Sequence, residues 1–288
     1  MELLIYGLVN SAILAVMAIG LSLTFGVSGI ANFAYGGFYI LGAYTCWGLF
    51  TQLGLPYLLS VILSMAALAA LGFIFYWVVF LRVRGMEISE AIASFGVGIA
   101  ILEFLRWWGF IGFYYNLPGF LKGSVEIGGV FVDCHRLIII GVALALVIFL
   151  WLFSHYTKIG LAFRGVAQEE RTALSLGINS DFTAALSVAF GSALGVLAAI
   201  TILPTGTILI DKGYDALLFA LAVGLVGGLE STLGVLLASL ILGFAQTAVA
   251  VYGATHWMMV VTLGAIIIVL AVKPSGLFGK SKELEERV

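Results

Sequence analysis

Residues 3–25 read LLIYGLVNSAILAVMAIGLSLTF and contain no charged side chain. A bilayer core about 30 Å thick is crossed by about 20 helical residues at 1.5 Å per residue, so this run is long enough to span it. A cleaved signal peptide has a basic start and a shorter apolar stretch, whereas the only early charge here is Glu2. The run therefore predicts a first transmembrane helix that is retained.

The composition of the whole chain agrees with lipid as its solvent. Hydrophobic residues make up 62% of the 288 residues and charged residues 10%. Soluble domains carry about 45–50% apolar and about 25% charged residues. The net charge of −2 gives no indication of a nucleic-acid partner.

Further apolar segments, each too long and too irregular for barrel strands, follow the first. We predict an all-α, polytopic transmembrane helix bundle that forms a single transmembrane domain over residues 1–288. About nine spans are expected, within a range of eight to ten, near 3–25, 33–52, 57–80, 89–111, 137–154, 182–203, 215–228, 232–252 and 256–272.

Two of these segments have features of broken or re-entrant helices. Segment 33–52 is rich in glycine, and segment 215–228 is both short and glycine-rich. Such segments are tolerated where they are buried in protein or line a wet cavity. A faint similarity between residues 7–44 and 191–228 hints at an internal repeat but is too weak to set a topology.

The basic residues of the connections predict the orientation. Lys and Arg gather in 81–88, in 155–181 and in the tail 273–288, while 112–136 and 204–214 have acids beside their basic residues. Nine alternating spans place the three basic regions on one side. Because basic loops remain in the cytoplasm, we expect a protein of the cell membrane with its N-terminus outside the cell and its C-terminus in the cytoplasm.

The sequence contains few candidates for a nucleotide-binding, metal-binding or catalytic site. Residues 274–281 read PSGLFGKS, but a phosphate-binding loop needs a glycine where Pro274 stands and lies between a strand and a helix. The histidines occur singly, and the two cysteines are far apart. We therefore predict no catalytic residues, no metal site and no cofactor.

Intramembrane charge is also sparse. Glu103 and Arg106, at i and i+3, are expected to pair structurally near the outer end of their helix. No series of acids crosses the predicted spans as an ion relay would require. A proton-driven or sodium-driven carrier is therefore not favoured, and the energy for any transport is expected to come from elsewhere.

The connection 155–181 is the most informative loop. Residues 167–176 are expected to form a short amphipathic helix, with acids in its first turn and Gly177 as its C-terminal cap. Ala167, Leu174 and Ile178 are candidates for its apolar stripe. A helix isolated between two spans has little core to pack against, so we expect either a partner surface or a helix lying on lipid.

Polar side chains at membrane depth are candidates for a translocation pathway. An unsatisfied polar group there costs several kcal/mol, so each needs a partner or a wet cavity. Hydrogen bonding between helices is an equally good explanation. The candidates are Asn10, Asn32, Tyr35, Tyr39 and Gln246.

A set of short motifs, taken in order, resembles a known family over essentially the whole chain. The pieces are GLSLTFG at 20–26, IANF at 30–33, LGAY at 41–44, Arg164 to Ile178, GLVGGLESTLG at 224–234 and KPSGLFG at 273–279. Together they resemble the LivH group of branched-chain amino acid ABC transporter permeases. One departure is Tyr35-Gly36-Gly37, where family members often carry a His-Gly-Glu or similar polar run.

The resemblance implies an importer of branched-chain amino acids. It also implies two ATPase subunits, a second related permease, and an extracytoplasmic substrate-binding protein. The loop 155–181 would then couple the permease to the ATPases, through Gln168, Glu169, Glu170, Arg171, Thr172, Ala173, Leu174 and Gly177. The same machinery for urea, amides or another small polar solute, and a stand-alone channel, are the alternatives.

Overall fold

All nine predicted helices are present in the computed structural model, which describes residues 1–110, 115–121 and 123–279. In chain order they are α1 (Glu2–Ser28), α2 (Tyr35–Thr51), α3 (Tyr57–Phe75), α5 (Glu87–Trp107), α6 (Cys134–Tyr156), α9 (Ser180–Ile202), α10 (Lys212–Gly227), α11 (Thr232–Tyr252) and α12 (Trp257–Val272). A π-helix, η1 (Tyr76–Phe80), and the short α4 (Leu81–Val83) extend α3 into one long span. Such π-helical insertions are often found at functional sites.

The helices differ in how much of the bilayer they can cross. In the described ranges, six are long and apolar enough to span it, namely α1, the α3–α4 unit, α5, α6, α9 and α11. The other three, α2, α10 and α12, have 16 or 17 residues. The predicted nine spans are therefore six full-length ones and three shorter apolar helices.

The two segments expected to be broken helices both begin in the interior of the bundle. The Tyr35 hydroxyl, in the first residue of α2, donates to the carbonyl of Met17 near the middle of α1 at 2.7 Å. A Cβ on Gly36 would overlap the carbonyl of Gly213, the second residue of α10. The starts of α2 and α10 thus meet at depth, with the backbones as close as glycine allows.

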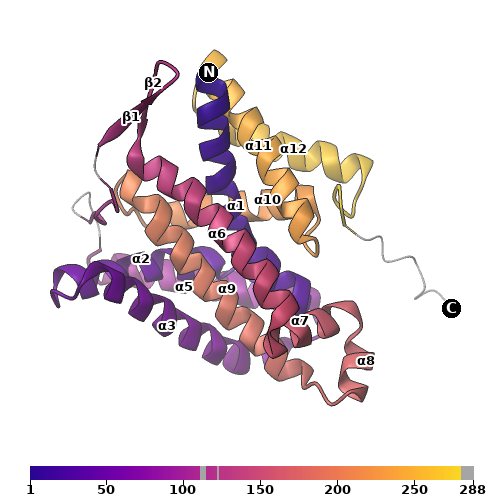
Figure 1. Ribbon diagram of the computed structural model, residues 1–288. Coiled ribbons are helices and arrows are strands. Elements are labelled where there is room, and N and C mark those ends of the chain that lie inside the picture. Colours follow the sequence, from indigo (N-terminus) through magenta and orange to yellow (C-terminus); the bar gives the residue numbers. More distant parts are fainter. Residues whose placement is uncertain (111–114, 122, 280–288) are drawn as a thin grey trace.

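The helices form two groups of four with matching contacts, and the first helices of the two groups, α1 and α9, run in opposite directions. The first group contains α1, α2, α3 and α5, and the second α9, α10, α11 and α12. Helix α1 packs against α11 as α9 packs against α3, and α10 contacts α12 as α2 contacts α5. Figure 1 shows α2, α3 and α5 gathered at the lower left and α10 to α12 at the upper right, with α1 and α9 between them.

Two reciprocal glycine contacts join the two groups. A Cβ on Gly20 would lie 2.9 Å from the carbonyl oxygen of Gly191, and one on Gly191 would lie 2.8 Å from that of Gly20. Gly36 and Gly213 face each other in the same way. The faint similarity between residues 7–44 and 191–228 falls on α1 with α2 and on α9 with α10, the helices that carry these contacts.

The share of each helix that is buried inside the chain agrees with the central position of α1 and α9. About 78% of the most apolar window of α9 is buried inside the chain, against 22% of that window in α6. Helix α9 is therefore the centre of the bundle, and the exposed apolar face of α6 is available to lipid.

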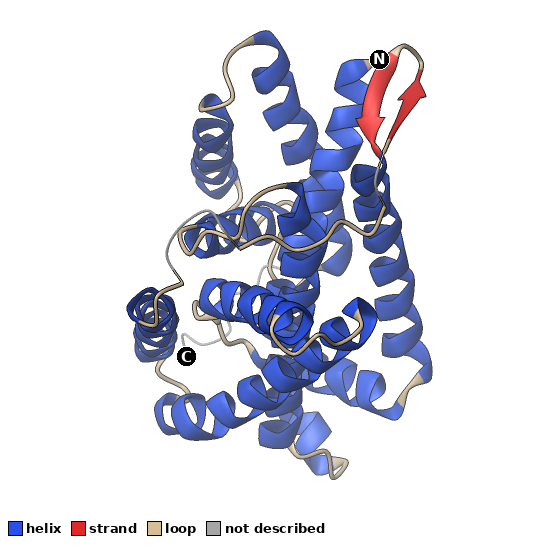
Figure 2. Cartoon of the chain, turned by 90° about the vertical axis from the view of Figure 1, so that its left-hand side faces the viewer, coloured by secondary structure: helices blue, strands red, loops and turns tan. Residues whose placement is uncertain are grey.

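A β-hairpin projects from one end of the bundle and was not predicted. Strands β1 (Ser124–Ile127) and β2 (Val130–Asp133) pair antiparallel around Gly128 and Gly129, which both have positive φ. Figure 2 shows these strands as red arrows beside the N-terminus, and Tyr6 of α1 donates a hydrogen bond to the Phe131 carbonyl at 3.1 Å. We call this end of the molecule the hairpin end.

The opposite end carries two short helices, α7 (Lys158–Gln168) and α8 (Glu170–Ser175), and we call it the α8 end. Arg84 pairs here with Glu170, and residues 276–278 pack against the end of α10 near residue 228. The two internal basic connections and the described start of the tail therefore lie at one end, as predicted. The rest of the tail, 280–288, lies outside the described residues.

Candidate functional site

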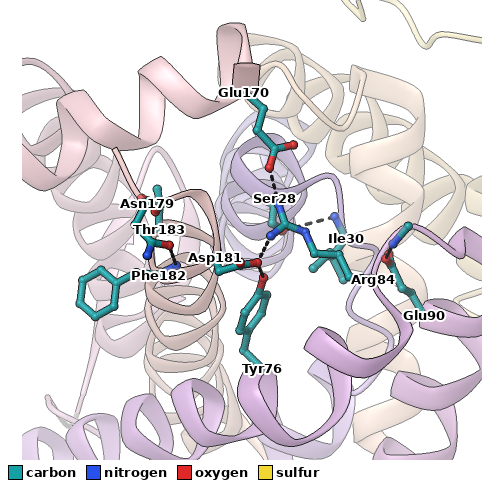
Figure 3. Close-up of polar contacts among 11 residues, drawn as sticks. Ser28, Ile30, Tyr76, Arg84, Glu90, Glu170, Asn179, Asp181, Phe182 and Thr183 are labelled. Carbon is teal, nitrogen blue, oxygen red and sulfur yellow. Dashed lines mark hydrogen bonds and ion pairs between the residues drawn. The ribbon is translucent and has the colours of Figure 1, made fainter. Parts of the chain in front are cut away.

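Arg84 is the centre of a polar network at the α8 end. Its guanidinium donates to the carboxylate of Asp181, in the first turn of α9, and to Glu170 of α8 at 2.6 Å. The Tyr76 hydroxyl of η1 donates to the same Asp181 carboxylate at 3.0 Å. Figure 3 shows Arg84 between the two acids, so that one side chain joins the α3–α4 unit, α8 and α9.

The backbone beside Arg84 is held in a fixed turn. Gly85 has a φ of +83°, which ends the helical stretch of α4. The buried Glu90 carboxylate accepts a hydrogen bond from the Gly85 N–H at 2.8 Å. The Arg84 side chain is 26% exposed, so its ion pairs are screened less than those of a fully exposed pair.

Helix α7 is packed onto the bundle through one apolar face. The Thr157 hydroxyl caps its start by accepting from the Gly160 N–H at 2.9 Å. Phe163 is buried with Val27 of α1 and Phe153 of α6. A Cβ on Gly160 would overlap the Phe153 carbonyl, so glycine is required where α7 crosses the end of α6. This packing fixes the position from which α8 starts.

The predicted continuous helix over 167–176 is wrong. Gln168 ends α7, Glu169 adopts an extended conformation with φ −159° and ψ +101°, and α8 begins at Glu170. Helix propensity contributes at most about 0.7 kcal/mol per ordinary residue. The ion pair of Glu170 with Arg84 and the burial of Ala173 are tertiary contacts that a single sequence does not reveal.

The predicted end of the helix is confirmed. Gly177 has a φ of +83° and its N–H donates to the Leu174 carbonyl at 3.0 Å. The N–H of Ile178 donates to the Ala173 carbonyl at 3.0 Å, which completes a glycine-terminated cap.

The outer surface of α8 is polar with two exposed leucines. Of the eight residues predicted to couple to a partner, Ala173 is buried against the chain itself, at 2% exposure. The other seven are exposed, namely Gln168, Glu169, Glu170, Arg171, Thr172, Leu174 and Gly177. Leu176, which was not predicted, is 77% exposed. We call Arg171, Thr172, Leu174 and Leu176 the α8 surface.

Three of the five pathway candidates take part in hydrogen bonds between helices. Asn10 of α1 donates to the Gln246 side chain of α11 at 2.8 Å, and Gln246 donates to Thr262 of α12 at 2.5 Å. Tyr35 binds the Met17 carbonyl, as described above. The Asn32 side chain accepts from the Ala34 N–H at 3.1 Å and so caps the turn before α2.

Tyr39, the fifth candidate, lines a cleft of about 320 Å³ at the hairpin end. The cleft is lined by α1, α2, the start of α10 and the connection from α9, which includes the 3-10 turn η2 (Leu203–Thr205). Lys212 and Asp215 of α10 line it as an ion pair, with 3.0 Å between Nζ and Oδ2. Arg106 pairs with Glu103, as predicted, and also contacts Asp211 at 2.9 Å, which anchors the start of α10 to α5.

The comparisons with known proteins agree over nearly the whole chain. Residues 3–271 match the model of a family described as "Branched-chain amino acid transport system / permease component". The permease protein BraD of a high-affinity branched-chain amino acid transport system from Pseudomonas aeruginosa is 29% identical, covering 97% of this chain and 96% of its own. The LivH permease protein of Escherichia coli K12 is 27% identical, covering 92% and 91%.

Two further similarities extend this result. A probable LivH permease protein of Methanocaldococcus jannaschii is 25% identical and covers 94% of this chain and 90% of its own. A chain of PsaBC from Streptococcus pneumoniae, solved in complex with Fab, superposes with a TM-score of 0.53 over 96% of this chain and 94% of its own. At 14% identity, this last similarity supports the fold alone.

A membrane-spanning bundle, a capped helix on the loop between α6 and α9, and a family match over residues 3–271 therefore lead to one assignment. The chain belongs to the family of permease components of branched-chain amino acid transport systems.

Proposed function

We propose that this chain is the membrane-spanning permease subunit of an ABC importer that translocates branched-chain amino acids. The observation that carries the proposal is the family match over residues 3–271. The relatives described above are named for branched-chain amino acids, which favours these substrates over urea and amides. ATP hydrolysis is assigned to separate subunits.

The partners in this proposal are those that the resemblance to the family implies. Two ATPase subunits supply the energy, a second related permease completes the membrane pathway, and an extracytoplasmic binding protein delivers the substrate. The α8 end carries the basic connections, and the positive-inside tendency supports our assignment of this end to the cytoplasm. The N-terminus and the hairpin end are then outside, where a binding protein docks.

In this orientation the α8 surface is the contact for the ATPases. Leu174 and Leu176 are 50% and 77% exposed, and apolar anchors at a polar surface are typical of a short helix that docks into a groove. Because α8 is tied to Arg84 and Arg84 to α9, movement of α8 is transmitted directly to the helix at the centre of the bundle.

The test is uptake by the assembled transporter in liposomes, with ATP inside and the binding protein outside. We expect accumulation of radiolabelled leucine, isoleucine and valine that stops when ATP is replaced by a non-hydrolysable analogue. Unlabelled urea or acetamide should not compete. Uptake that continues without ATP hydrolysis would instead identify a channel, and competition by urea would assign another solute.

A further inference from the structure

The cleft at the hairpin end combines opposite charges with an apolar wall. We propose that it binds the zwitterionic head group of an α-amino acid, with Lys212 contacting the carboxylate and Asp215 the α-ammonium group. This inference rests on the proposed function, because it specifies a binding site for the substrate inside the permease. It adds residues to which the family match assigns no role.

The ion pair is able to accept a ligand. Lys212 and Asp215 are 52% and 41% exposed, and in the described part of the chain their mutual contact is the only side-chain hydrogen bond of either residue. An ammonium group has three donors and a carboxylate has two acceptor oxygens, so both retain bonding capacity. The ammonium and carboxylate groups of an α-amino acid are attached to the same carbon atom and so lie close together. They therefore match the ends of two oppositely charged side chains that are themselves in contact, as Lys212 and Asp215 are.

Tyr39 provides an independent indication of a ligand. Its side chain lines the cleft although the residue is only 1% exposed. Within the described ranges, its hydroxyl has no protein hydrogen-bond partner. The Tyr39 hydroxyl is open to the cleft and not sealed in the core, so a ligand or water in the cleft can be its partner.

The remaining wall is suited to an aliphatic side chain. Met17, Ile202, Leu203, Leu209 and Phe219 line the cleft beside the charged pair. Small-molecule sites usually have volumes of about 300–1,000 Å³, are mostly apolar, and contain a few polar groups that fix orientation. The cleft volume of about 320 Å³ lies at the lower end of this range, which suits a small ligand.

The experiment measures protection of a cysteine placed in the cleft of the complete transporter in liposomes. Thr205, an exposed residue of the lining, is changed to Cys in a Cys134→Ser background and labelled with a membrane-impermeant maleimide. The labelling rate is compared with and without L-leucine, 4-methylpentanoate, which keeps only the carboxylate, and 3-methylbutylamine, which keeps only the ammonium group.

We expect saturating leucine to slow labelling by about tenfold and either analogue to slow it much less, because each leaves one charge of the site unmatched. Lys212→Gln and Asp215→Asn should each abolish protection by leucine. Glu126→Gln on the exposed strand β1 should preserve it. An unchanged labelling rate without ligand confirms that each variant is folded.

The inference and the proposed function fail in different ways. Leucine uptake by the unsubstituted transporter without protection at position 205 would overturn the inference alone. Equal protection by leucine and by both analogues, or protection that persists in Lys212→Gln and Asp215→Asn, would also overturn it. Absence of ATP-driven leucine uptake would overturn the proposed function and the inference with it.

Discussion

The guanidinium of Arg84 donates a hydrogen bond to the carboxylate of Asp181, and so joins the α3–α4 unit to the first turn of α9 across 97 positions of the chain. Asp181 also accepts from Tyr76, and Arg84 also donates to Glu170. Helix α8 is thus connected through one side chain to two long membrane helices.

We expect Arg84→Gln to lower binding-protein-stimulated ATP hydrolysis and uptake together, because α8 loses its link to α9. A double-mutant cycle that combines Arg84→Gln with Asp181→Asn should give a coupling energy of about 0.5–3 kcal/mol in the free energy of unfolding of the purified complex. Arg82→Gln is the matched control, since Arg82 is exposed and has no ion pair among the described residues. Additive effects of the two substitutions would contradict the link.

Substitutions in α8 should separate folding from docking. Ala173 is buried, so Ala173→Trp should reduce the amount of folded permease, because overpacking costs about 1–3 kcal/mol or more. Leu174→Gln with Leu176→Gln should leave that amount unchanged but lower the recovery of the ATPases in co-purification. Leu121→Gln, at an exposed leucine of the hairpin end, is the control. Full recovery of the ATPases with the double variant would show that the α8 surface is not part of the interface with them.

The glycine contact between α2 and α10 predicts strict size limits. Gly36→Ala should strongly reduce expression and thermal stability, because the new methyl group would overlap the Gly213 carbonyl. Gly96→Ala in α5 is the control, since a Cβ there has no neighbour within 4 Å. Alanine in a helix is favoured over glycine by about 0.5–1 kcal/mol, so this control should be neutral or stabilising. Equal tolerance of both substitutions would show that the close approach is unnecessary.

Gln246→Leu distinguishes a helix-packing role from a pathway role. The substitution removes hydrogen bonds to Asn10 and Thr262, and bonds of this kind between membrane helices are worth about 0.6–2 kcal/mol. We expect a lower melting temperature of the purified complex and an unchanged KM for leucine uptake. An altered KM at unchanged stability would instead place Gln246 in the translocation pathway.

The orientation can be tested with single cysteines in a Cys134→Ser background. Glu126→Cys at the hairpin end should react with a membrane-impermeant thiol reagent on intact cells, whereas Arg171→Cys in α8 should react only after permeabilisation. Both residues are exposed, so access to the side chain is not limiting. The reverse pattern would invert the topology.

The sequence was sufficient for the nine apolar helices and insufficient for the short helices α7 and α8 and for the contacts between helices. Apolar length identified the six helices that are long enough to span the membrane, because the bilayer requires about 20 helical residues whatever the fold. The hairpin was missed although Gly128-Gly129 is a recognised turn signal, since the surrounding connection lacks a long alternating pattern. The break at Glu169 and the Arg84–Asp181 pair depend on tertiary contacts that local propensity does not contain.

The candidate site was predicted only in part for the same reason. The segment was found because a capped helix between two spans is unusual, and Gly177 ended it as expected. The burial of Ala173 and the exposure of Leu176 depend on which face α8 turns toward α9. A helix of six residues has too few turns for sequence periodicity to decide this.

The contact between the two groups of helices has a mechanical consequence. Gly20 with Gly191 and Gly36 with Gly213 are buried where the first group of helices touches the second. A rocking movement about such a fulcrum separates the helices on one side by as much as it brings them together on the other. If the proposed permease moves in this way, one contact region would keep its path from being open at both ends at once.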